Sequence, residues 1–215
     1  MDLEAARAAM IDSQVRPNDV TDHRLIMAMA SVAREAFIPA SRKAVAYADI
    51  AIETLPGRWM MQPRDFAKLI QVAGVQATDR VLDIAAGTGY SSVVLSRVAA
   101  GVVALEEDPA AARALEGGMA GAIPNITVVS GPLKAGAPGH APFDVIFVNG
   151  AVEEVPKAWT DQLAEGGRLA VVVAEGHVRR ARIYARAGGK TAWRTPFDSA
   201  APSLPGFERA AEFRL

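Results

Sequence analysis

The feature that most constrains the fold is a regular alternation of short apolar runs and helical patterns after Thr78. Runs rich in Val, Ile and Leu stand at 80–85 (RVLDIA), 101–107 (GVVALEE), 126–131 (ITVVSG), 143–150 (FDVIFVNG) and 168–173 (RLAVVV). Helical patterns separate them at 90–98, 108–119 and 155–163. Uninterrupted apolar runs of this kind are typical of parallel strands buried on both faces. The pattern predicts a doubly wound, Rossmann-like α/β sheet.

The flanking segments carry different patterns. Apolar residues recur at helical spacing from Leu3 to Val32, and a further helix is expected at 63–72 with Pro63 in its first turn. Pro56-Gly57 breaks the pattern between them, so a loop is expected to carry GRWMMQP at 57–63. Gly188-Gly189 lies between two mixed runs and predicts antiparallel strands at a sheet edge. We therefore expect one domain, 1–215, made of an N-terminal segment (1–77), a cofactor-binding core (78–175) and C-terminal strands (176–215).

Composition excludes several classes of protein. A length of 215 residues with 51% hydrophobic content suits one well-cored domain. The net charge of -1, without a basic stripe, argues against nucleic-acid and membrane-surface partners. There is no cysteine and the three histidines are scattered, so no metal site is expected. The N-terminus lacks the pattern of a secretion signal, and no apolar stretch reaches membrane-spanning length, so a cytoplasmic location is expected.

The strongest chemical motif is VLDIAAGTGY at 81–90, a strand that ends in a glycine-rich turn opening a helix. A dinucleotide-binding turn would carry a third glycine at the position of Ser92, and Asp83 would place a carboxylate near the phosphates. A ligand with a cationic end and no phosphate avoids both conflicts, and S-adenosylmethionine is such a ligand. Asp83 is then expected to assist binding of its amino-acid part, while Gly87 and Gly89 allow close approach of the backbone.

A second carboxylate fits the same ligand. Glu106 is the first acid after the next apolar run and is expected to accept hydrogen bonds from both ribose hydroxyls. Taken alone, the turn could be a tight strand-to-helix connection and Glu106 a solvated strand end. Their common register in one strand–helix–strand unit favours the cofactor.

With these residues in place, the sequence resembles the class I S-adenosylmethionine-dependent methyltransferases, and among them the protein-L-isoaspartate O-methyltransferase family. The resemblance covers nearly the whole chain. It rests on SQVRPNDVTDHRLIMAMASVAREAFIP (13–39), YADIAIE (47–53), MQP (61–63), HAPFDVIFVNGA (140–151) and LAEGGRLAVVV (163–173). It implies an enzyme that transfers methyl from S-adenosylmethionine to a carboxylate of damaged, isoaspartyl-containing protein or peptide, and it places the acceptor site at Met61 and Gln62.

The chain departs from the family pattern at several positions. Members carry a serine before Gln-Pro that is implicated in holding the isoaspartyl carboxylate, and this position is Met61, whose thioether donates no hydrogen bond. Members also tend to have Gly-Asp after the third sheet strand, where the Asp accepts from the adenine amine. Here the pair is Gly131-Pro132, so adenine is expected to be held by packing and by backbone such as that of Leu133.

Two further positions follow from the resemblance. Ala85 stands where glycine is usual, and Asn149 follows the fourth strand, where the family lines its site. Because Met61 replaces the family serine, isoaspartyl transfer is expected to be slow or redirected, with Arg58 or backbone N–H groups of the loop as other groups that could hold a carboxylate. Otherwise Arg58 is interpreted as a solvated charge, and Trp59 and Met60 as ordinary packing.

Two alternatives stay open at this point. The first is a family-derived cofactor-binding protein that has weak isoaspartyl activity, uses a different acceptor, or employs GRWMMQP as an apolar docking surface. The second is an NAD-linked oxidoreductase, which Asp83 and Ser92 disfavour.

Overall fold

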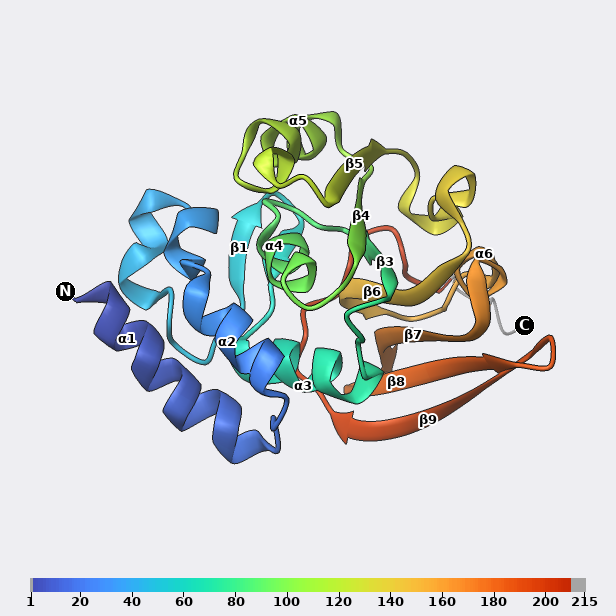
Figure 1. Cartoon of the computed structure of the whole chain (residues 1–215), viewed down its shortest axis with the longest axis horizontal. Coiled ribbons are helices and arrows are strands. Elements are labelled where there is room, and N and C mark those ends of the chain that lie inside the picture. The colour runs from blue at the N-terminus through green and yellow to red at the C-terminus, as the bar shows by residue number, and fades with distance from the viewer. Residues whose placement is uncertain (1, 210–215) are drawn as a thin grey trace, which may run out of the picture.

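The computed structural model describes residues 2–209, and within this range a seven-stranded sheet runs in the order β5-β4-β3-β6-β7-β8-β9 (Figure 1). Strands β3 to β7 are parallel to one another, and β8 and β9 extend the sheet antiparallel at one edge. The strands of this sheet are β3 (Arg80–Ile84), β4 (Gly101–Glu106), β5 (Ile126–Ser130), β6 (Phe143–Val152), β7 (Leu163–Glu175), β8 (Val178–Ala187) and β9 (Lys190–Asp198). The predicted doubly wound sheet with C-terminal antiparallel strands is confirmed.

The helices that cover the sheet begin at residues that favour a helix N-terminus. Asp108 caps α5 by accepting hydrogen bonds from the backbone N–H groups of Ala110 and Ala111, and Pro63 occupies the first position of α3. The helices are α1 (Leu3–Met10), α2 (His23–Ser31), α3 (Pro63–Ala73), α4 (Tyr90–Ser96), α5 (Pro109–Gly117) and α6 (Lys157–Asp161). Helix α6 is shorter than expected, because β7 already begins at Leu163.

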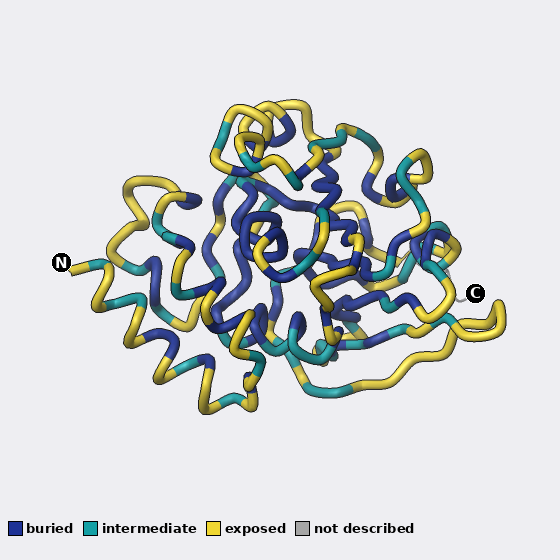
Figure 2. The backbone as a smooth tube through the Cα atoms, in the orientation of Figure 1, coloured by how far each residue is buried: buried dark blue, intermediate teal, exposed yellow. Residues whose placement is uncertain are grey.

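The central strands β3, β4 and β6 are buried on both faces, whereas β9 at the edge of the sheet is largely exposed (Figure 2). Successive side chains on a strand point to opposite faces. Val81 and Phe147 accordingly pack into a core shared with α3, α4 and the N-terminal helices, while Leu82 and Ile146 pack into a second core around Trp159. This double burial explains why the strands read as uninterrupted apolar runs.

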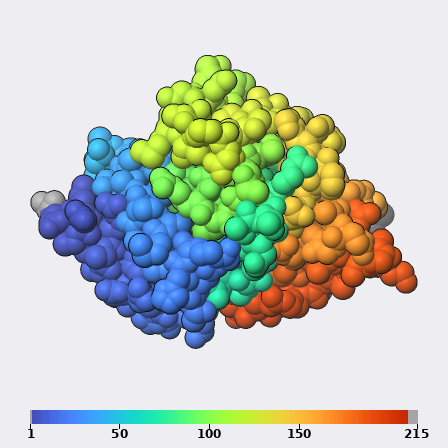
Figure 3. Space-filling model, viewed as in Figure 1, coloured from blue at the N-terminus to red at the C-terminus, as the bar shows by residue number. Residues whose placement is uncertain are grey.

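The N-terminal segment packs against the sheet domain. Helix α1 continues as a π-helical stretch, Ile11–Val15, and Met10, Leu25 and Met29 are almost completely buried. Figure 3 shows the blue N-terminal surface in direct contact with the green central part of the chain. The N-terminal segment also contacts GRWMMQP, because Arg34 donates a hydrogen bond to the carbonyl oxygen of Met61.

The predicted loop at 57–63 is wrong in part, because residues 58–60 form a strand. Strands β1 (Ile52–Leu55) and β2 (Arg58–Met60) pair antiparallel as a separate two-stranded sheet. Pro56-Gly57, read as a breaker, forms the hairpin turn, with Gly57 in the left-handed region at φ 70°. Because side chains alternate along a strand, Met60 points inward and Trp59 outward. Trp59 is 37% exposed, so its interpretation as ordinary packing is also wrong.

After β9 the chain returns to the sheet as an extended segment rather than a further strand. The backbone N–H of Ala151 donates to Pro202 O at 2.8 Å, and the N–H of Leu204 donates to Ala151 O at 2.7 Å. Residues 210–215, the end of the predicted C-terminal segment, lie outside the described residues, as does Met1. Among the helices of residues 2–209, none combines the length and the apolar character that crossing a membrane requires.

Candidate functional site

The candidate site lies where the order of strands in the sheet reverses. From β3 the chain passes outward to β4 and β5 and then returns to β6 on the other side of β3. Ligands of open α/β sheets bind beyond the carboxyl ends of the strands at such a switch point. Ala85, which follows β3, and Asn149, near the end of β6, flank this point.

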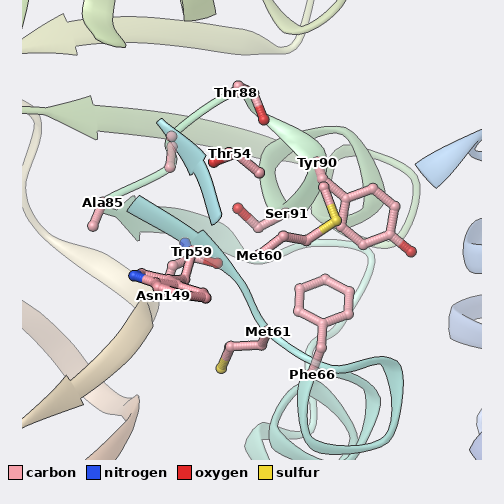
Figure 4. A pocket seen from close by; sticks show the side chains of 12 residues that line it. Thr54, Trp59, Met60, Met61, Phe66, Ala85, Thr88, Tyr90, Ser91 and Asn149 are labelled. Atoms are coloured by element: carbon pink, nitrogen blue, oxygen red, sulfur yellow. The ribbon is translucent and has the colours of Figure 1, made fainter. Parts of the chain in front are cut away.

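A small cavity at this point brings the hairpin and the glycine-rich turn together (Figure 4). Its volume is about 20 Å³. It is lined by Thr54, Trp59, Met60, Met61, Phe66, Ala85, Ala86, Gly87, Thr88, Tyr90, Ser91 and Asn149. Four predicted site residues, Met61, Ala85, Gly87 and Asn149, thus share one cavity with residues of β1 and β2.

Asp83 lies beneath this cavity rather than in it. Its carboxylate is fully buried and accepts hydrogen bonds from Ser91 Oγ at 2.7 Å, Ser92 Oγ at 2.5 Å and Asn149 Nδ2 at 2.7 Å. Burial raises the pKa of Asp83 from its ordinary 3.8 to about 6, and the three hydrogen bonds oppose that rise. Asp83 therefore acts on the cavity through Ser91 and Asn149, which it orients.

The raised pKa of Asp83 predicts a pH dependence of stability. Its folded-state pKa exceeds the unfolded value, so its contribution to the free energy of unfolding is fully present below about pH 4 and is lost as the pH rises through about 6. The loss amounts to about 3 kcal/mol. Chemical denaturation from pH 4 to 7 should show wild type losing this much relative to Asp83→Asn, which does not titrate. Parallel curves for the two proteins would contradict the assignment.

Glu106 is not a solvated strand end. It is fully buried, and both carboxylate oxygens accept from Arg58 Nε at 3.0 Å. Oε1 also accepts from the Gly87 N–H at 2.7 Å, and Oε2 accepts from the Glu107 N–H at 3.2 Å. The Arg58 side chain is 11% exposed, so its interpretation as a solvated charge is wrong.

The backbone before Gln62 is fixed from behind by Arg34. This fully buried side chain donates through Nη2 to Met61 O at 2.6 Å and through Nε to Ala46 O at 2.8 Å. Burial lowers the pKa of Arg34, while Tyr90, whose ring centre lies 5.2 Å from the guanidinium carbon, raises it. The main chain at Met61 is therefore rigidly placed, and its buried side chain faces the cavity.

Gln62 points away from the cavity, into the start of α3. Its Nε2 donates to Asp65 Oδ2 at 2.9 Å, and the same oxygen accepts from Ser199 Oγ at 2.6 Å and the Ala200 N–H at 2.8 Å. Gln62 thus ties the hairpin to α3 and to the returning C-terminal segment. This geometry gives it a positioning role rather than contact with an acceptor.

The three residues predicted to hold adenine do not line the cavity. The Gly131 N–H donates to Glu106 O at 2.9 Å, Pro132 is exposed, and the Leu133 N–H donates to Glu107 Oε2 at 2.9 Å. The backbone of Leu133, expected to help hold adenine, already has its N–H engaged by this last bond. Glu107 fixes the end of β5 beside the end of β4.

The glycines of the turn have different roles. A Cβ on Gly89, at φ 94°, would lie 2.7 Å from Leu115 Cδ1, so glycine is required there for packing against α5. A Cβ on Gly87, at φ 58°, would point at Thr54 Oγ1 and Arg58 Cβ, 3.6 and 3.7 Å away. Gly87 therefore faces the cavity, and Gly89 does not. Ala85 also has φ 58°, a conformation that costs a non-glycine residue about 1 to 2 kcal/mol.

The residues present fit S-adenosylmethionine once Arg58 of the hairpin has moved away from Glu106. A buried carboxylate beside a glycine N–H at the end of β4, at a switch point, is a suitable acceptor for ribose hydroxyls. A cavity of about 20 Å³ is far below the 300 Å³ or more typical of ligand pockets. The hairpin covers Glu106 through Arg58, so this contact must open. Between residues 2 and 209, no three His, Asp or Glu side chains are grouped to hold a metal ion.

Sequence reasoning missed three contributors to the site. Arg34 is the only charged residue in MAMASVARE before Glu35, and a lone charge in an apolar run was the available signal for a buried polar anchor. Ser91 and Ser92 open the helix that follows the Asp83 strand, so their hydroxyls face back toward that carboxylate. This spacing was visible in the sequence, but its direction depends on the turn geometry.

Comparison with known proteins points in one direction. Residues 5–197 match the family model described as protein-L-isoaspartate(D-aspartate) O-methyltransferase. The protein-L-isoaspartate O-methyltransferase of Methylorubrum populi is 39% identical over 170 residues, 79% of this chain and 80% of the relative. The enzyme of the same name from Roseiflexus sp. strain RS-1 is 39% identical over 187 residues, 86% of this chain and 84% of the relative.

Solved structures share the fold. One, named protein-L-isoaspartate O-methyltransferase, superposes with a TM-score of 0.80 at 26% identity over 93% of this chain, which spans 66% of that longer protein. A candidate protein-L-isoaspartate O-methyltransferase from Plasmodium falciparum, solved with S-adenosyl-L-homocysteine, gives a TM-score of 0.76 at 18% identity. The alignment covers 95% of this chain and 98% of that one, and this second likeness concerns the fold alone.

Proposed function

The chain belongs to the protein-L-isoaspartate(D-aspartate) O-methyltransferase family and is an S-adenosylmethionine-dependent methyltransferase, and we propose that it esterifies isoaspartyl carboxylates at the cavity beside Gly87. One observation carries the location of the site. The family's acceptor segment, set in register by Gln62-Pro63, and the glycine-rich turn line one cavity, to which they contribute Met61 and Gly87. This arrangement supports the assignment of methyl transfer to this cavity.

The chemistry asks little of the protein. A carboxylate with an ordinary pKa near 4 is ionised at neutral pH, so no general base is required. When bound, S-adenosylmethionine supplies a sulfonium methyl that a carboxylate oxygen attacks, forming the O–CH₃ bond as the S–CH₃ bond breaks. The contribution of the chain is therefore to bind, to align and to exclude water.

Residues of the site divide these tasks. We assign the ribose hydroxyls to Glu106, and the amino-acid end of the cofactor to the region that Asp83 organises through Ser91 and Asn149. The apolar side chains of Met61, Phe66 and Tyr90 line the cavity and limit access of water to it.

We also propose that the three segments of residues 1–215 work as one methyltransferase domain. The hydrogen bonds that join Asp65 to Gln62 and Ser199, and Arg34 to Met61, support this, because the N-terminal and C-terminal segments both brace the cavity. A cytoplasmic location and the absence of nucleic-acid and membrane partners stay predictions from the sequence.

The proposal is tested with a protein that has been aged to accumulate isoaspartyl residues. Label from methyl-labelled S-adenosylmethionine should enter the aged protein in clear excess over a fresh sample, and it should be released by mild alkali, as methyl esters are. Equal labelling of both samples, or alkali-stable label, would rule out isoaspartyl esterification. Calorimetric titration with S-adenosylhomocysteine and with NAD should give binding of the first only.

Pro132 predicts weak recognition of the adenine amine. The amine donates hydrogen bonds, and Pro132 offers no carboxylate oxygen to accept one at the position where family members tend to have an Asp. Wild type should therefore bind S-adenosylhomocysteine and an analogue altered at the adenine amine with similar affinity. Pro132→Asp should favour the natural compound by about two- to tenfold, the worth of one partly solvated hydrogen bond. Identical discrimination by both proteins would show that the amine is held elsewhere.

A further inference from the structure

Arg58 occupies the carboxylate that the proposed cofactor site requires. Its Nε lies 3.0 Å from both oxygens of Glu106, and the Gly87 N–H and Glu107 N–H complete the hydrogen bonds of that carboxylate. With these donors in place, ribose hydroxyls bind Glu106 only by displacing one of them. The two backbone donors belong to the glycine-rich turn and to the end of β4, so the side chain of Arg58 is the donor that can leave.

The cavity itself offers an anionic acceptor no charge. Its lining residues include no Lys, Arg or His. Arg34 lies behind the hairpin, where its guanidinium donates to the carbonyl oxygens of Met61 and Ala46. Arg58 lies on β2, three positions before Met61. It is paired with Glu106, the carboxylate to which the cofactor is assigned.

We propose that Arg58 binds the isoaspartyl carboxylate once the cofactor has taken Glu106. The inference rests on the proposed function and identifies how its acceptor is held where Met61 donates no hydrogen bond. A guanidinium removed from a buried carboxylate retains its charge, and pairing with another carboxylate restores the lost charge-assisted hydrogen bonds. A separate cavity of about 170 Å³, lined by Arg58 with Leu55, Pro56, Asp108, Ala110 and Ala111, gives the side chain room to leave Glu106.

The exchange couples the two ligands. Without S-adenosylhomocysteine, Glu106 and the peptide carboxylate compete for the guanidinium of Arg58. When S-adenosylhomocysteine is bound, its ribose occupies Glu106, and the peptide carboxylate binds Arg58 without this competition. S-adenosylhomocysteine should then strengthen peptide binding by about tenfold to a hundredfold, within the usual range of such couplings, and the peptide should strengthen S-adenosylhomocysteine binding equally.

Calorimetry on the whole chain tests this without turnover, because S-adenosylhomocysteine carries no methyl to transfer. An isoaspartyl peptide is titrated into wild type, Arg58→Gln and Arg16→Gln, each with and without saturating S-adenosylhomocysteine. Arg16 pairs with Asp12 on the surface and serves as the matched control for loss of a guanidinium. Wild type and Arg16→Gln should show the coupling, and Arg58→Gln should lose it. Arg58→Gln should also bind S-adenosylhomocysteine at least as tightly as wild type, since no ion pair then has to open.

Several results would overturn the inference. They are equal peptide affinity with and without S-adenosylhomocysteine in wild type, retained coupling in Arg58→Gln, or weaker S-adenosylhomocysteine binding by that variant. A second test uses wild type alone and a peptide whose isoaspartyl carboxylate is already methylated. The inference predicts that this peptide shows no coupling, because the ester carries no charge to pair with Arg58, and retained coupling would contradict it. Asp108 is the other acid beside Arg58, and its capture of the released side chain would appear as absent coupling. Failure of the proposed function differs from all of these, because it would appear as coupled binding without ester formation.

Discussion

Replacement of Glu106 by Gln should weaken S-adenosylhomocysteine binding by about tenfold to thirtyfold. Two hydrogen bonds from ribose hydroxyls to a buried carboxylate are together worth about 2 to 4 kcal/mol after partial replacement by solvent, or about 30- to 1,000-fold in affinity. Wild type does not gain all of this, because the ribose must first displace Arg58. Gln keeps one acceptor oxygen but loses the charge and the second oxygen, so the single substitution weakens the ribose contact and also releases its competitor, and the observed loss is smaller than the full value.

The Arg58→Gln background separates the two contributions. There the competitor is already absent, so adding Glu106→Gln should cost the full 30-fold or more. Calorimetric titration of the four proteins of this cycle measures both effects, and Glu116→Gln, an exposed acid on α5, controls for loss of a carboxylate. If Glu106→Gln left the affinity unchanged in both backgrounds, Glu106 would not be the ribose acceptor.

Met61→Ser should raise the rate of isoaspartyl methylation by about tenfold to a hundredfold. The hydroxyl would donate to one carboxylate oxygen and fix the other in line with the methyl, and a hydrogen bond to a charged group is worth about 1.5 to 3 kcal/mol. The gain should appear in kcat, because alignment is improved, whereas Arg58 acts on acceptor affinity. Arg34 holds the Met61 carbonyl at 2.6 Å, so the new hydroxyl would start from a fixed backbone.

The same substitution should lower the free energy of unfolding. Met61 is 2% exposed, and truncation of a buried methionine costs about 2 to 5 kcal/mol. Kinetics should therefore be measured well below the melting temperature of the variant. Met60→Ser is the matched control, since it removes a buried methionine from the same cavity without placing a hydroxyl at the family position. Equal kcat for wild type and Met61→Ser would show that the segment aligns its acceptor through another group.

The parallel core of the fold could be predicted from the sequence because its signals are local. Strands β3, β4 and β6 and the 169–173 part of β7 are buried on both faces, so they appear as apolar runs without further context. The hairpin could not be predicted in the same way, because Pro56-Gly57 is equally consistent with the end of a pattern and with a two-residue turn. The pairing of Ile52 with Met60 shows that a hairpin forms, and such pairing depends on the folded structure rather than on local sequence.

The chemical partners within the site show the same limit. Asp83 and Glu106 lie near the carboxyl ends of β3 and β4, yet their surroundings come from distant parts of the chain. Asn149 reaches Asp83 across 66 residues, and Arg58 reaches Glu106 across 48. Residue type and spacing single out the two carboxylates. Only the packed structure shows that Asp83 is enclosed by hydrogen-bond donors and that Glu106 is held by Arg58 of β2.

The central claim is that this chain methylates isoaspartyl carboxylates, and a pair of isomeric peptides tests it most directly. Two synthetic peptides that differ only in an isoaspartyl or a normal aspartyl linkage are incubated with the enzyme and methyl-labelled S-adenosylmethionine, and methyl ester is measured by mass spectrometry. The account predicts ester on the isoaspartyl peptide, formed slowly by wild type and faster by Met61→Ser, with little on the aspartyl isomer. A wild-type enzyme that binds S-adenosylhomocysteine but forms no ester on the isoaspartyl peptide, or forms as much on the normal isomer, would contradict it.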